Sequence, residues 1–175
     1  MKNKPTLLLC VCCAPCATQP IEKLLKDYDI TLFFANSNIF PEEEFRKRFD
    51  NAQKLAEIYN LTLIESKYKH QDWKNFVKGL ETEPEKGKRC EKCFEYNLSI
   101  GAKFAEKNNF DFFTTTLTIS PHKNSETIFA VGKNFDKFLP VDFKKDNGFQ
   151  KSLKLSKKYN LYRQNYCGCE FSTRE

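Results

Sequence analysis

Short apolar runs alternate along the chain with longer segments in which apolar residues recur every three or four positions. A short apolar run between polar segments is typical of a buried strand, and the longer spacing is typical of a helix with one buried face. The pattern predicts strands at residues 6–12, 30–35, 61–65 and 110–117, and a short fifth strand at 139–143. It predicts helices at residues 18–28, 42–59, 70–80, 91–107, 125–138 and 150–160.

The alternation of strands and helices indicates an α/β fold with a mainly parallel sheet. Because crossovers between parallel strands are right-handed, helices should cover both faces of the sheet in a three-layer sandwich. No internal repeat or linker divides the sequence, so we expect a single domain over residues 1–175 with an irregular, cysteine-bearing tail from about residue 161. Ligands of such sheets bind at the carboxyl ends of the strands, which residues 12–16 and 119–124 follow.

The composition is 40% hydrophobic and 30% charged, and no run of about 18 apolar residues suggests a transmembrane helix. The apolar part of residues 1–9 is too short for a signal peptide, so we expect a cytoplasmic protein without a membrane partner. The chain has 8 cysteines. In the reducing cytosol such thiols are normally metal ligands or catalytic groups rather than structural disulfides.

Two cysteine pairs have the spacing of metal ligands, Cys13 with Cys16 and Cys90 with Cys93. Residues 17–89 separate the pairs, so the fold must bring them together, unlike the two halves of a local zinc ribbon. With only 2 histidines in the chain, an all-sulfur site for zinc or an iron–sulfur cluster is expected. The adjacent thiols of Cys12 and Cys13 favour the cluster. A structural zinc and unligated buried thiols are the alternatives.

The sequence Cys167-Gly168-Cys169 is a different arrangement, in which glycine permits a tight turn between two thiols. A disulfide between them would close a small strained ring and would be redox-active. The alternatives are two additional metal ligands or two thiols without a function. Cys10, inside the first predicted strand, is expected to be a small core residue.

Two common nucleotide-binding motifs are missing from the sequence. Neither G-x-x-x-x-G-K-[ST] nor G-x-G-x-x-G is found, so neither a P-loop nor a dinucleotide cradle is indicated. Electrons, if they are transferred here, should therefore pass through metal and thiols rather than NAD or flavin. The net charge of +6 suits a polyanionic partner, and also suits an ordinary basic surface.

Five segments together resemble the QueH family of epoxyqueuosine reductases. They are residues 12–16 (CCAPC), 36–41 (NSNIFP), 89–94 (RCEKCF), 114–124 (TTTLTISPHKN) and 161–172 (LYRQNYCGCEFS). The resemblance implies the last step of queuosine synthesis, in which the epoxide of epoxyqueuosine at the wobble position of tRNA is reduced. It implies a [4Fe–4S] cluster, an additional iron and an external electron donor, without cobalamin or ATP. It also implies a fold similar to the HUP-like PP-loop ATP pyrophosphatases, without their phosphate loop.

The resemblance also implies roles for individual cysteines. The cluster ligands would be Cys12, Cys13, Cys90 and Cys93. Cys16 stands where the family also has Asp, another anionic ligand, and would hold the second iron. Cys167 and Cys169 would form the redox-active disulfide.

Three residues after the fourth predicted strand are candidates for contact with the substrate. His122 is the candidate proton donor, with a hydrogen-bonded structural histidine as the alternative, and Lys123 and Asn124 are candidates for binding phosphate or a base edge. A basic segment could meet tRNA phosphates or form a solvated helix face: Lys144, Lys145, Lys151, Lys154, Lys157, Lys158 and Arg163. The alternative functions are a cluster-dependent tRNA thiolation enzyme and a non-catalytic, metal-binding redox sensor.

Overall fold

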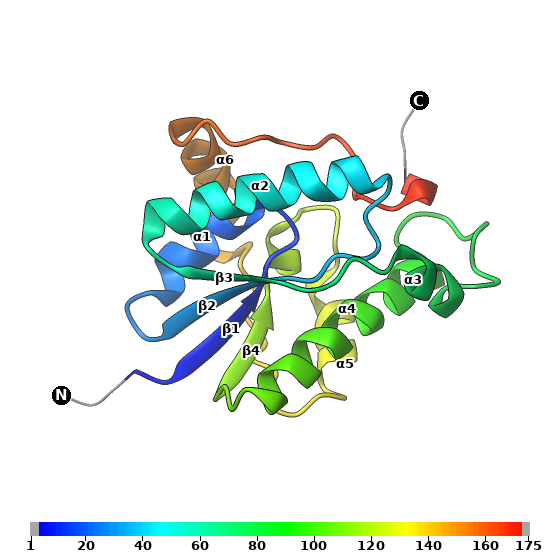
Figure 1. Ribbon diagram of the computed structural model, residues 1–175, viewed down its shortest axis with the longest axis horizontal. Coiled ribbons are helices and arrows are strands. Elements are labelled where there is room, and N and C mark those ends of the chain that lie inside the picture. The colour runs from blue at the N-terminus through cyan, green and yellow to red at the C-terminus, as the bar shows by residue number, and fades with distance from the viewer. Residues whose placement is uncertain (1–3, 173–175) are drawn as a thin grey trace.

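A computed structural model describes residues 4–172 of the chain. Its centre is a sheet of four parallel strands in the order β3-β2-β1-β4 (Figure 1). The strands are β1 (Thr6–Cys10), β2 (Asp29–Phe34), β3 (Thr62–Glu65) and β4 (Phe112–Thr115). The helices are α1 (Ala14–Leu24), α2 (Glu42–Tyr59), α3 (His70–Phe76), α4 (Lys88–Lys107), α5 (Ser125–Gly132) and α6 (Gly148–Lys158). Short 3-10 turns lie at Thr116–Ile119, Lys145–Asn147 and Glu170–Ser172.

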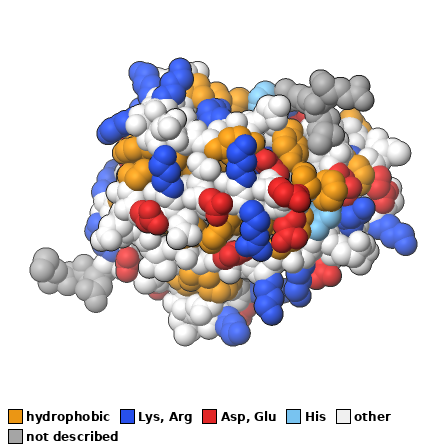
Figure 2. Space-filling view, turned by 45° about the horizontal axis from the view of Figure 1, so that its top comes forward, with side chains coloured by type: hydrophobic (Ala, Val, Ile, Leu, Met, Phe, Trp, Pro, Cys, Tyr) orange, Lys and Arg blue, Asp and Glu red, His pale blue; other side chains and the backbone are white. Residues whose placement is uncertain are grey.

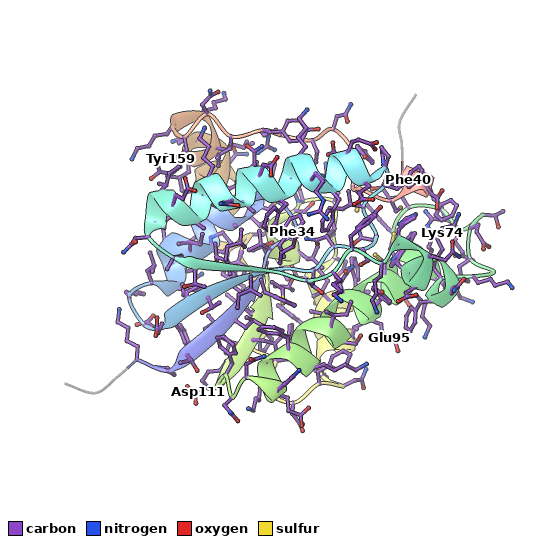
Figure 3. The ribbon with its side chains drawn as sticks, viewed as in Figure 1. Phe34, Phe40, Lys74, Glu95, Asp111 and Tyr159 are labelled. Atoms are coloured by element: carbon purple, nitrogen blue, oxygen red, sulfur yellow. The ribbon has the colours of Figure 1, made fainter. Side chains whose placement is uncertain are left out.

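Helices cover both faces of the sheet, so the predicted three-layer sandwich is confirmed. Figure 1 shows α1, α2 and α6 on one side of the sheet and α4 and α5 on the other. The strand β1 separates two hydrophobic clusters because successive side chains of a strand point to opposite faces. Leu7 and Leu9 pack with α1 and α2, whereas Leu8 packs with α4 and α5. Phe34 of β2 packs against Phe45 of α2, between the sheet and that helix (Figure 3).

The first helix begins earlier than the predicted residue 18, and β1 ends at Cys10 rather than at residue 12. Pro15 lies in the first turn of α1, where a backbone N–H has no partner within the helix, so proline starts the helix rather than delaying it. The turn between β1 and α1 is therefore short. It places the cysteines of residues 12–16 directly at the carboxyl end of the central strand.

Two predicted elements near residue 138 were wrong. The helix predicted to reach residue 138 ends at Gly132, because the chain turns back and the ring of Phe138 packs over that glycine, where a Cβ would lie 2.2 Å from the ring. The fifth strand predicted at residues 139–143 is absent from the described residues, where one bridge between Phe113 and Phe138 replaces it. The last strand is also shorter than predicted, and a 3-10 turn follows it.

Among residues 4–172, no helix is long and apolar enough to cross a membrane.

Candidate metal centre

Three cysteines meet where β1 passes into α1. The sulfur atoms of Cys12, Cys13 and Cys16 all lie within 4.8 Å of one another. Cys13 is the extended residue that precedes the helix, and Cys16 follows it by about one turn. The chain geometry of CCAPC therefore gathers three thiols in one place, and this group is suited to hold a metal.

The electrostatics of this group favour a bound cation. Hydrogen bonds from Cys13 and Cys16 hold the pKa of the Cys12 thiol well below its ordinary value. The pKa values of Cys13 and Cys16 are raised, chiefly by their hydrogen bonds to Cys12. The group therefore stabilises one thiolate, at Cys12, while Cys13 and Cys16 favour the protonated form. Three thiolates at this spacing require a positive charge between them, which metal supplies.

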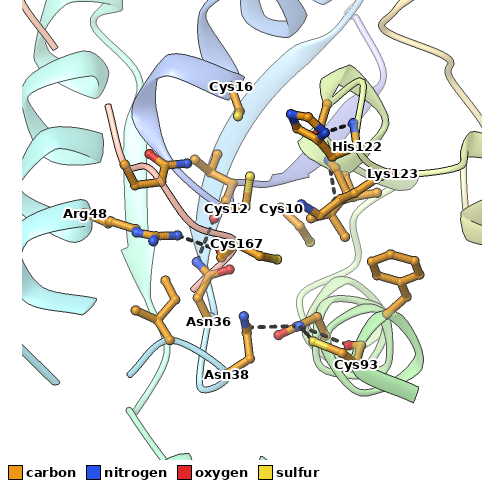
Figure 4. A pocket seen from close by; sticks show the side chains of 18 of the residues that line it. Cys10, Cys12, Cys16, Asn36, Asn38, Arg48, Cys93, His122, Lys123 and Cys167 are labelled. Atoms are coloured by element: carbon orange, nitrogen blue, oxygen red, sulfur yellow. Dashed lines mark hydrogen bonds between the residues drawn. The ribbon is translucent and has the colours of Figure 1, made fainter. Parts of the chain in front are cut away.

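The second cysteine pair lies at the beginning of α4. Cys93 lines the same cavity of about 200 Å³ as Cys12 and Cys16 (Figure 4). Cys90 and Cys93 also line an adjoining cavity together with Cys167. The fold therefore brings sequence-distant cysteines to one hollow, although Cys90 and Cys93 are outside the group of three that lies within 4.8 Å. Burial raises the pKa of both α4 thiols.

Each of the four cysteines proposed from the family resemblance as cluster ligands accepts a hydrogen bond from a group outside the cysteines. The sulfur–donor distances are 3.4 Å for Cys12 from Thr116 Oγ1, 3.0 Å for Cys13 from Gln164 Nε2, 3.3 Å for Cys90 from the Lys86 backbone N and 3.5 Å for Cys93 from Asn97 Nδ2. Donors of this kind orient metal-binding thiolates and offset their charge. Thr116 and Gln164 belong to the motifs that carried the resemblance, but the sequence pattern alone gave them no role.

Cys167 and Cys169 are free thiols at the cavity wall. Between them Gly168 has a φ of +137°, which L side chains rarely adopt. A Cβ at Gly168 would lie 3.1 Å from Nη1 of Arg48, so only glycine fits this turn without a shift. Both the backbone conformation and the packing at residue 168 therefore favour glycine.

A buried arginine holds this turn, and the sequence analysis missed it. Arg48 of α2 is 2% exposed, donates to the carbonyl oxygens of Cys167 (2.9 Å) and Tyr166 (3.3 Å), and pairs with Glu44 at 2.7 Å. Burial alone would lower the pKa of Arg48, but Glu44 raises it and keeps the side chain charged. Arg48 lies on the apolar face of α2, three residues after Phe45. A charged residue on an apolar helix face could have been identified from the sequence as a candidate buried ion-pair partner.

The candidate residues after β4 also reach the cavity. His122 and Lys123 line both cavities, and Asn124 lines the smaller one. Burial would lower the pKa of Lys123, but the negative charge of Cys167 and Cys12 outweighs it and raises the pKa. Lys123 is therefore a cation facing the thiols. The Oδ1 atom of Asn124 accepts from the backbone N–H groups of residues 126 and 127, so this side chain also caps α5.

The basic segment is divided in the structure. Lys144 donates to the carbonyl oxygens of Thr118 and Lys123, and so supports the loop before α5. The four lysines of α6 are exposed, and so is Arg163 at the rim of the larger cavity. Figure 2 shows Lys and Arg side chains without carboxylates between them at the upper left, over α6.

Replacing Cys10 by alanine is expected to leave the metal content unchanged. Cys10 lies outside the group of three, and its sulfur packs so closely on α4 that a Cβ at Gly101 would lie 2.6 Å from it. Burial raises the pKa of this thiol to about 12. The variant should lose about 1 kcal/mol of stability through the small cavity left behind. Iron analysis and urea unfolding measure the two quantities, and loss of iron would make Cys10 a ligand.

The chain is similar to known proteins over nearly its whole length. The family model described as "Epoxyqueuosine reductase QueH" matches residues 7–175. A relative of that name from Streptococcus pyogenes serotype M1 is 42% identical, over 98% of this chain and 71% of its own length. Another from Thermotoga maritima is 36% identical, over 97% of this chain and 91% of its own.

The fold is also found in a solved structure, the U34-tRNA thiolase NcsA from Methanococcus maripaludis with its [4Fe-4S] cluster. The TM-score is 0.60 at 14% identity, and the match covers 99% of this chain but 63% of that protein. This likeness supports the predicted HUP-like fold class. On the full-length sequence matches, the chain belongs to the epoxyqueuosine reductase QueH family.

Proposed function

We propose that this chain reduces the epoxide of epoxyqueuosine in tRNA to give queuosine, in the cytoplasm and without cobalamin or ATP. The observation that carries the proposal is the convergence of cysteines from β1–α1, α4 and the C-terminal segment (residues 161–172) on one hollow, in a chain of this family. The hollow lies at the carboxyl ends of the strands, where α/β sheets bind their ligands.

The proposed cofactor is a [4Fe–4S] cluster held by Cys12, Cys13, Cys90 and Cys93, with an additional iron on Cys16. A cluster is larger than a single ion, so its ligands need not all lie within the 4.8 Å that groups the first three cysteines. The hydrogen-bond donors at all four sulfurs support this ligand set. Such a centre would supply electrons singly and would act as a Lewis acid toward an epoxide oxygen.

The reaction needs two electrons and two protons per epoxide. Both carbon–oxygen bonds of the epoxide break, a carbon–carbon double bond forms and the oxygen leaves as water, with the electrons coming from an external reductant. Lys123, held as a cation beside the cavity, stabilises negative charge on the departing oxygen. His122 lines the cavity and is exposed, so it exchanges protons with solvent and is the proposed proton donor.

The C-terminal cysteines have a separate proposed role. Cys167 and Cys169 close a redox-active disulfide that passes reducing equivalents or resets the site after turnover. Their turn at Gly168 and their place beside Cys90 and Cys93 support this role. The anticodon base enters unstacked, and the α6 lysines, Arg163 and Asn124 are the proposed contacts to the RNA.

The lysines of α6 make a test of the RNA contact possible. Replacing Lys151 and Lys154 by alanine should reduce the salt dependence of tRNA affinity by about one logarithmic unit of slope per lysine, because each phosphate contact releases counterions. Lys103 and Lys107 of α4, which are also exposed, provide the matched control pair. Equal slopes for the two double variants, measured by filter binding between low and physiological salt, would contradict the contact.

The direct test of the function is anaerobic incubation of the iron- and sulfide-reconstituted chain with epoxyqueuosine tRNA and a chemical reductant. Mass spectrometry of the released nucleosides should show queuosine. Cluster-loaded protein that forms none would overturn the proposal. A thiolated nucleoside formed only with ATP would instead support a thiolation enzyme.

A further inference from the structure

Two amide side chains that line the larger cavity donate hydrogen bonds to proposed metal ligands. Asn97 of α4 donates from Nδ2 to the sulfur of Cys93 at 3.5 Å and also to its carbonyl oxygen at 3.0 Å. Gln164 of the C-terminal segment donates from Nε2 to the sulfur of Cys13 at 3.0 Å. Both amides line this cavity, and no role is assigned to either of them by the family resemblance.

The other end of each amide has no partner. Asn97 Oδ1 and Gln164 Oε1 are buried and accept no hydrogen bond among the described residues. A buried acceptor without a partner lowers stability, and in native proteins such groups call for an explanation other than folding. The orientation of both amides satisfies the sulfurs and leaves their own oxygens unsatisfied. For Gln164, whose amide nitrogen donates to the sulfur of Cys13, this arrangement favours a role toward the thiolate rather than toward the fold. Asn97 Nδ2 shares its two hydrogens between the sulfur of Cys93 and two oxygen acceptors, so it serves both the fold and the thiolate.

Both donors are placed by further contacts. The Nδ2 atom of Asn97 also donates to Asn38 Oδ1 at 3.1 Å, in the loop after β2; Figure 4 shows these bonds beside Cys93. Gln164 is held by the attachment of the C-terminal segment to α2, where Arg48 binds the carbonyl oxygens of residues 166 and 167. The donor on Cys13 therefore belongs to the same segment that carries Cys167.

We propose that Asn97 and Gln164 are positioning residues that raise the reduction potential of the metal centre through N–H···S hydrogen bonds. This inference rests on the proposed cluster. A donor at a ligand sulfur withdraws electron density and stabilises the reduced, more negative state more than the oxidised state. Since Gln164 is on the C-terminal segment, the attachment of that segment sets part of the potential.

The test is a redox titration of reconstituted protein, followed by its visible absorption and electron paramagnetic resonance. Gln164→Met and Asn97→Leu keep the approximate volume and remove the donor. Each is expected to lower the ratio of reduced to oxidised centre, at a fixed potential near the midpoint, by about three- to tenfold. Gln164→Glu, which brings a negative charge to Cys13, should shift the equilibrium further in the same direction.

Gln19→Met is the matched control, because Gln19 is also a buried amide with an unpartnered Oε1 but lines neither cavity. It should leave the potential unchanged. Variants of Asn97 and Gln164 that bind the cluster at the wild-type potential, with only their thermal stability altered, would overturn the inference. If Asn97→Leu does not fold, the reduction potential of Asn97→Asp, which also lacks the donor, tests the role of this site. Wild-type protein that takes up no cluster would instead overturn the cofactor proposal, on which this inference depends.

Discussion

Replacing Cys93 by alanine is expected to remove most of the iron from reconstituted protein and to abolish queuosine formation. Cys93 is the α4 thiol that lines the same cavity as Cys12 and Cys16. Its replacement removes one of the four proposed cluster ligands. Loss of a partner that merely orients a ligand weakens metal binding 10- to 100-fold, so loss of a ligand should exceed about 100-fold. Iron and sulfide analysis, together with mass spectrometry of nucleosides, measures the effect.

Cys16→Ala is the informative comparison, because Cys16 lies as close to Cys12 and Cys13 as a ligand would. The proposed ligand set predicts that this variant keeps the cluster absorption and loses only the additional iron. Cys10→Ala controls for removal of a thiol from the same region. If Cys16→Ala lost the cluster while Cys93→Ala retained it, the cluster would be bound by the group at β1–α1 and the proposed set would be incorrect.

Replacing Arg48 by methionine is expected to lower the free energy of unfolding by about 3–5 kcal/mol, the usual cost of removing one partner of a buried ion pair. Glu44, whose side chain is 11% exposed, would lose its cationic partner, and the carbonyl oxygens of Tyr166 and Cys167 would lose their donor. The C-terminal segment should then detach from α2. Urea unfolding measures the first effect, and alkylation of Cys167 and Cys169, followed by mass spectrometry, measures the second.

Arg46→Met is the matched control on the same helix. Arg46 pairs with Glu42 and Glu65, but its side chain is 47% exposed, so its loss should cost less than about 1 kcal/mol. Equal stability of the two variants, with equal alkylation rates at Cys167, would show that Arg48 does not hold the segment. Faster alkylation of Cys167 only in Arg48→Met would support the assignment.

The sequence predicted the central strands β1 and β2 well because each contains a short apolar run buried on both faces. The runs at Leu7–Leu9 and at Phe33 and Phe34 have no polar interruption, so their type was readable from composition. The positions at which helices and strands begin and end were less predictable. Pro15 was compatible with the first turn of a helix, and the segment at 139–143 pairs with the edge strand β4 only through the bridge between Phe138 and Phe113.

The site was predictable to the extent that its residues lie in motifs. The motifs and the family resemblance indicated His122, Lys123 and every cysteine except Cys10. The structure places these residues on the walls of two adjoining cavities, apart from Cys13, which lies beside Cys12 and Cys16. The donors to the sulfurs depend on contacts such as that of Gln164 with Cys13, whose distance along the chain leaves no periodic signal. Arg48 interrupted an apolar helix face and could have been singled out on that ground.

Electron counting tests whether this cavity is the site of a cluster-dependent epoxide reduction. Reductant is added anaerobically in known portions to cluster-loaded protein with epoxyqueuosine tRNA, and queuosine is quantified after each portion by mass spectrometry. We expect one queuosine for every two electrons consumed beyond those that reduce the protein itself. Electrons consumed without queuosine, or queuosine formed without reductant, would contradict it.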